Sequence, residues 1–99
     1  MGSWRKRLAA MIADSDPRSY TFEEAAGILD HIGFVQGSHG GSHRRFRREL
    51  PDPNVPSGKR GVIIGLVQSG SGCLKPVYVV EMIAALRENK LLPKEVLEL

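Results

Sequence analysis

The 99 residues, of which 41% are hydrophobic and 25% charged, have the composition of one ordinary globular domain and exclude a disordered, collagen-like or coiled-coil chain. No apolar run approaches the roughly 20 residues that cross a bilayer, and no signal-like apolar core follows the first residues, so we expect an intracellular, cytoplasmic protein. The single cysteine, Cys73, cannot form an internal disulfide, and we expect neither a metal nor a cofactor.

The positive charge of the chain is concentrated in its middle. Lys and Arg exceed Asp and Glu by 14 to 11, a net charge of only +3. Between residues 37 and 60, however, the basic side chains are opposed only by Glu49 and Asp52. The basic residues of this segment are Arg44, Arg45, Arg47, Arg48, Lys59 and Arg60. The positive field is therefore local.

Two helices are expected in the first third of the chain. Residues 4–13 contain good helix formers and precede a turn-forming segment. Thr21 and Glu24 have the spacing of a capping box, so a second helix is expected to start at Phe22. Gly33 stands where a left-handed C-terminal cap is required. The apolar stripe expected on this helix consists of Phe22, Ala25, Ala26, Leu29 and Ile32.

Three strands are expected after this helix. A short strand begins at residues 34–35, residues 37–41 form a glycine-rich turn, and residues 42–50 form the second strand of a hairpin. The proline-rich segment 51–58 cannot continue the ladder, because proline lacks the N–H donor. The third strand is expected at residues 61–68, where Val and Ile are frequent.

A final helix is expected at residues 77–90. Pro76 suits the first turn of this helix, and Pro93 follows its end. Its buried side is expected to carry Val79, Val80, Ile83 and Leu86.

The order of these elements predicts an α+β fold, with a three-stranded antiparallel sheet covered by helices on one face. Without its first helix, the order is that of double-stranded RNA-binding domains. We expect one domain, residues 1–99, with an N-terminal helical extension at 1–20, a core at 21–92 and a tail at 93–99.

The densest chemical signal is the segment from Gly41 to Arg48. Strand alternation puts His43, Arg45 and Arg47 on one face and turns Phe46 toward the core. Neighbouring guanidinium groups disfavour an imidazolium, so we expect an exposed, neutral histidine that accepts a proton while the arginines hold a phosphate. Such a pair suits the attack of a ribose 2′-hydroxyl on its own phosphodiester, a reaction that needs no metal.

Simpler interpretations of the same residues stay open. An exposed histidine is more often idle than catalytic, and an arginine-rich strand often serves only to protect a sheet edge. The two Gly-Ser-His triplets, at residues 37–39 and 41–43, are also typical of turns. They leave it open whether His39 contributes to the chemistry beside His43.

Several motifs together resemble the HicA family of bacterial toxin ribonucleases. Gly33-Phe34 matches the end of the family's helix, and Gly41-Ser42-His43 follows eight residues later. Phe46 stands at the family's aromatic position, and residues 74–78 resemble the start of its last helix. The resemblance covers residues 22–92, and it departs from the family at residues 65–68, where members often carry Pro-His.

The resemblance implies a small, metal-independent endoribonuclease, an mRNA interferase, that is neutralised by a HicB-like antitoxin. His43 takes the place of the family's catalytic histidine and would be the general base. The groups that would bind RNA phosphates are Ser42, Arg44, Arg45, Arg47 and Lys75. The alternative is a non-catalytic RNA-binding module with the same fold.

Overall fold

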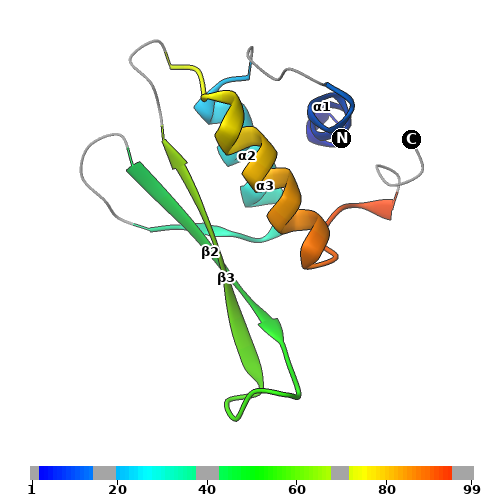
Figure 1. Cartoon of the computed structure of the whole chain (residues 1–99), viewed down its shortest axis with the longest axis vertical. Coiled ribbons are helices and arrows are strands. Elements are labelled where there is room, and N and C mark those ends of the chain that lie inside the picture. The colour runs from blue at the N-terminus through cyan, green and yellow to red at the C-terminus, as the bar shows by residue number, and fades with distance from the viewer. Residues whose placement is uncertain (1–2, 15–19, 38–42, 68–71, 95–99) are drawn as a thin grey trace.

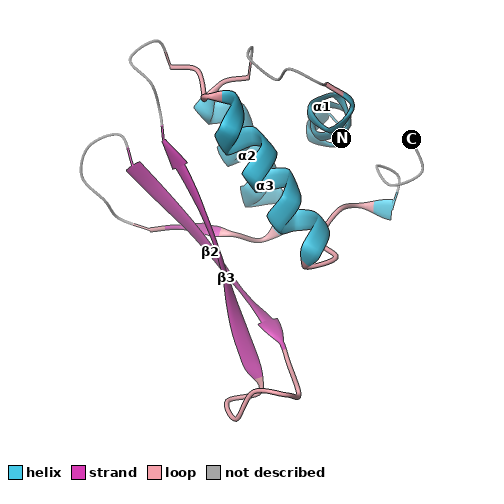
Figure 2. Ribbon diagram, viewed as in Figure 1, coloured by secondary structure: helices cyan, strands magenta, loops and turns pink. Residues whose placement is uncertain are grey.

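The computed structural model of the chain describes residues 3–14, 20–37, 43–67 and 72–94. Three helices and three strands follow one another in the predicted order, and their bounds lie within two residues of those expected from the sequence. Figure 1 traces them along the chain, and Figure 2 separates helices from strands. The elements are α1 (Ser3–Ala13), α2 (Phe22–Ile32), β1 (Val35–Gln36), β2 (His43–Pro51), β3 (Lys59–Val67) and α3 (Pro76–Glu88).

Helix α2 begins and ends as the sequence predicts. The Thr21 hydroxyl accepts a hydrogen bond from the Glu24 backbone N–H at 3.1 Å. In return, the Glu24 carboxylate accepts from the Thr21 N–H at 2.9 Å. Gly33 closes the helix in the left-handed region, with φ 105°. Local hydrogen bonding thus fixes both ends of α2, and so fixes where β1 begins.

The strands form one antiparallel sheet in the order β1-β2-β3. β2 and β3 pair from His43 opposite Val67 to Pro51 opposite Lys59, whereas β1 pairs only with Phe46 and Arg47. Burial alternates along β2, as predicted, and it alternates along β3 as well. The buried positions of these strands are Phe46, Leu50, Val62, Ile64 and Leu66.

The helices cover one face of the sheet and leave the other open. Figure 1 shows α2 and α3 on the same side of the strands, with α1 beyond them. The core lies between this helix layer and the sheet, where Phe46 meets Phe22 at a ring-centroid distance of 6.2 Å. The far end of the β2–β3 hairpin projects beyond the helices. The predicted α+β architecture is therefore confirmed.

Two details of the helix faces were predicted wrongly. Val80 is 56% exposed, because the buried stripe of α3 runs through Val79, Met82, Ile83 and Leu86. On α2, Ile28 is buried and Ala26 is only partly buried, so the stripe is shifted by a fraction of a turn. In the part of the chain that the structure describes, the helices are too short or too polar to span a bilayer.

Candidate active site

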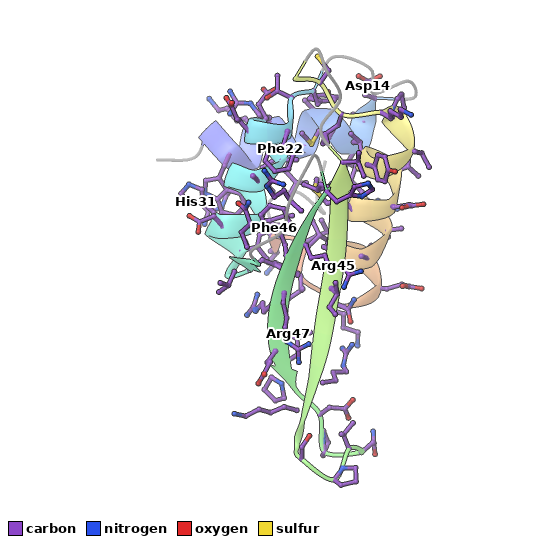
Figure 3. All side chains as sticks on the ribbon, turned by 90° about the vertical axis from the view of Figure 1, so that its left-hand side faces the viewer. Asp14, Phe22, His31, Arg45, Phe46 and Arg47 are labelled. Carbon is purple, nitrogen blue, oxygen red and sulfur yellow. The ribbon has the colours of Figure 1, made fainter. Side chains whose placement is uncertain are left out.

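The open face of the sheet carries the polar side chains of β2. His43, Arg45, Arg47 and Glu49 are all exposed, as strand alternation predicts. Figure 3 views the molecule from this side, with Arg45 and Arg47 along the strand pair and the helices behind. The face has little cover because two of the facing β3 positions are glycines, Gly61 and Gly65.

His43 lies at the beginning of β2, beside the first turns of α3. It lines a hollow of about 410 Å³ between the strand pair and the helix. The Arg44 guanidinium donates a hydrogen bond to the carbonyl of the adjacent His43 at 2.9 Å. The lining residues are His43, Arg44, Arg45, Gly65, Leu66, Val67, Tyr78 and Glu81. The predicted histidine and two of the predicted arginines are thus brought together.

Two further functional groups of this hollow were not predicted. Tyr78 and Glu81 lie three residues apart on α3, a spacing that puts both side chains on the same side of a helix. They add a phenol and a carboxylate to the lining of the hollow. The sequence gives one indirect signal, the resemblance of residues 74–78 to a family motif. Only the packing of α3 on β3 brings the two side chains to His43.

Arg47 belongs to a different hollow, which lies on the open face of the sheet. A Cβ built on Gly61 would lie only 2.7 Å from the Arg47 guanidinium, so this side chain rests on the glycine. Gly61 pairs with Glu49, farther along the hairpin from His43, and the Arg47 guanidinium lies 3.7 Å from the Glu49 carboxylate. Arg47 therefore leans away from His43.

This second hollow has a volume of about 640 Å³ and is bordered by β1, β2 and β3. Arg45 lines both hollows, since it stands between His43 and Arg47 on the strand. Its neighbour across the strands is Gly65, where an added Cβ would meet nothing within 4 Å. The residues that line the second hollow are Gly33, Val35, Gln36, Gly37, Arg45, Arg47, Arg48, Glu49 and Ile63.

Arg48 and Lys75 do not line the hollow at His43. Arg48 turns to the helix side, where its guanidinium donates to the Ile32 carbonyl. Lys75 is exposed at the N-terminal cap of α3 and is not among the residues that line the histidine hollow. Ser42 and His39 lie outside the described residues.

Among the described residues, no three His, Cys, Asp or Glu side chains are grouped so that they would hold a metal ion. A comparison of the chain with protein-family models, with curated proteins and with solved structures finds no match in any of the three.

Proposed function

We propose that the protein is an endoribonuclease that cleaves mRNA with His43 as its general base, without a metal or a cofactor. One observation carries this proposal: an exposed histidine and an exposed arginine, His43 and Arg45, line the same hollow of about 410 Å³. The histidine is the proton acceptor that this reaction requires, and the arginine is the cation that a phosphate requires.

In the proposed reaction, an imidazole nitrogen of His43 takes the proton of a ribose 2′-hydroxyl. The 2′ oxygen attacks the adjacent phosphorus, and the bond from phosphorus to the 5′ oxygen breaks. The products are a 2′,3′-cyclic phosphate and, once the departing oxygen is protonated, a 5′-hydroxyl. Arg45 stabilises the negative charge on the phosphate oxygens. Ser42, Arg44 and Lys75 are proposed to add further phosphate contacts.

A HicB-like antitoxin is the proposed partner. The resemblance to HicA toxins motivates this proposal, and the surface around the site suits it. Arg45 and Arg47 would pair with acidic side chains of the partner, and the exposed Val35 and Ile63 with apolar ones. Because the substrate is mRNA, we propose a cytoplasmic location. Purification of the protein with its genomic neighbour would identify such a partner.

The direct test is the variant His43→Ala, assayed for RNA cleavage in EDTA and for growth arrest on expression. Loss of a general base lowers the rate by about 10² to 10⁴, so both effects should disappear. His31→Ala is the matched control, because His31 is an exposed histidine of α2 whose ring stacks on Trp4 at 5.3 Å, not on the strand face. Undiminished cleavage by His43→Ala would place the chemistry elsewhere.

The same assay separates the alternative, a non-catalytic RNA-binding module. Such a module needs the arginines but has no use for the imidazole. It would bind RNA in a salt-sensitive manner and leave the RNA intact in EDTA and in Mg²⁺ alike.

A further inference from the structure

The hollow at Arg47 is too far from His43 to hold the same phosphate. The two residues are four positions apart on one strand, which separates their Cα atoms by about 14 Å. The Arg47 guanidinium increases this separation, because it rests on Gly61 toward the far end of the hairpin. The second hollow must therefore bind a different part of any ligand that reaches His43.

The floor of the second hollow is apolar. Val35 on β1 and Ile63 on β3 are both directly opposite Arg47, so the three side chains form one row across the sheet. Val35 is 71% exposed and Ile63 is 55% exposed. Aliphatic side chains left this open within a hollow offer a surface to an apolar ligand face.

The walls of the hollow are cationic. Arg45 and Arg47 stand along one side and are opposed by one carboxylate, that of Glu49. Arg48 also borders the hollow, but its guanidinium is bonded to the Ile32 carbonyl. A ligand that fits must therefore combine an apolar face with an attached negative charge.

We propose that this hollow binds the base of a nucleotide that neighbours the cleaved linkage. The base lies on Val35 and Ile63, and the guanidinium of Arg47 pairs with the phosphate of the same nucleotide. Arg45, which lines both hollows, holds the phosphate that links this nucleotide to the one at His43. RNA as the ligand rests on the proposed function. A base within a duplex is stacked and paired, so the substrate is single-stranded at this position.

The test measures binding on a His43→Ala background, so that cleavage does not interfere. The probe is a fluorescent single-stranded oligoribonucleotide of six residues, and its dissociation constant is read by anisotropy. Adding Ile63→Ser should weaken binding about five- to tenfold, the lower end of the range for base-stacking contacts. Adding Val80→Ser is the matched control, since Val80 is an equally exposed aliphatic residue on α3, and it should change binding less than twofold.

A second set of probes tests whether the loss of affinity comes from a contact with a base. Oligoribonucleotides with one abasic residue at each position in turn should bind His43→Ala more weakly at one position. At that position, the abasic residue should cost less once Ile63→Ser is present, because both changes remove the contact between the base and Ile63. A duplex of the same sequence should bind more weakly than the single strand.

Two variants test the cationic wall. Gly61→Ala displaces the Arg47 guanidinium, the flexible end of a long side chain, and should weaken binding without unfolding the chain. Glu49→Gln removes the carboxylate that faces Arg47 and should strengthen binding.

Equal effects of Ile63→Ser and Val80→Ser would overturn the base site. So would an abasic penalty that is as large in Ile63→Ser as without it, or tighter binding of the duplex. These outcomes are distinct from failure of the proposed function, which is cleavage that survives His43→Ala.

Discussion

At the scale of single residues, Arg48 serves the fold although it belongs to the basic strand. Its guanidinium donates to the Ile32 carbonyl, the last of α2, and its side chain passes over Gly33. The last carbonyls of a helix have no partners within the helix, and its C-terminal end attracts a cation. Arg48 therefore fastens the end of α2 to the middle of β2, and thereby aligns the strand that carries His43.

Replacing this arginine should destabilise the protein. Arg48→Met keeps the apolar stem but removes the charged donor, and we expect the free energy of unfolding to fall by about 1 to 2 kcal/mol. Arg45→Met is the matched control, since Arg45 is exposed on the open face of the same strand. Urea denaturation measures both. Equal stability of the two variants would show that the bond to Ile32 contributes nothing.

At the scale of elements, the openness of the site depends on a glycine in the middle of β3. Gly65 faces Arg45 and lines the histidine hollow, and space for a side chain exists there. Glycine weakens a strand interior, whereas valine suits it. The sequence thus keeps a residue that is unfavourable for the strand at the place where a side chain would occupy the site.

Gly65→Val should separate stability from activity. We expect the melting temperature to stay the same or rise, while RNA cleavage falls about tenfold or more because the added side chain displaces substrate from His43 and Arg45. Gly27→Ala on α2 is the matched control, because an added Cβ there also meets nothing within 4 Å. It should raise stability and leave cleavage unchanged. Full activity of Gly65→Val would mean that the substrate does not enter this hollow.

Features set by neighbours in the chain were predicted from the sequence, and features set by packing between elements were not. Thr21, Glu24 and Gly33 define α2 through contacts with their own neighbours in the chain, and these contacts are readable from spacing. Strand alternation likewise assigned His43 and Phe46 to opposite faces. Tyr78 and Glu81, by contrast, reach the site only because α3 packs on β3.

The directions of individual side chains could not be predicted from sequence spacing, for a similar reason. Alternation put Arg47 on the face of His43, but its lean toward Gly61 depends on which residue of β3 is glycine in the final register. The exposure of Val80 depends on how α3 is rotated against the sheet. Such details are set by packing between elements.

At the scale of the whole molecule, one face of the sheet is covered by helices and the other presents Arg45 and Arg47 to solvent (Figure 3). A polyanion that binds this face releases counterions from its phosphates, so its affinity falls as salt rises. The slope of log affinity against log salt therefore reports how many phosphate contacts each arginine makes.

We expect the plot of log affinity against log salt for single-stranded RNA to become shallower by about 0.7 for each phosphate contact that is lost. Arg45→Ala and Arg47→Ala should each reduce the slope by about this amount, measured on the His43→Ala background. Arg87→Ala is the control, because Arg87 is exposed on α3 and not on the sheet face. An unchanged slope in Arg45→Ala would contradict a phosphate site at the centre of the face.

The most direct measurement is the chemical identity of the RNA ends made in EDTA. The wild-type protein should leave 2′,3′-cyclic phosphates and 5′-hydroxyls, detected by mass spectrometry of a short oligoribonucleotide of known sequence. His43→Ala should leave the oligonucleotide intact, and His31→Ala should give the wild-type products. Products that carry a 5′-phosphate, or cyclic phosphates formed equally well by His43→Ala, would contradict the role of His43 as the general base.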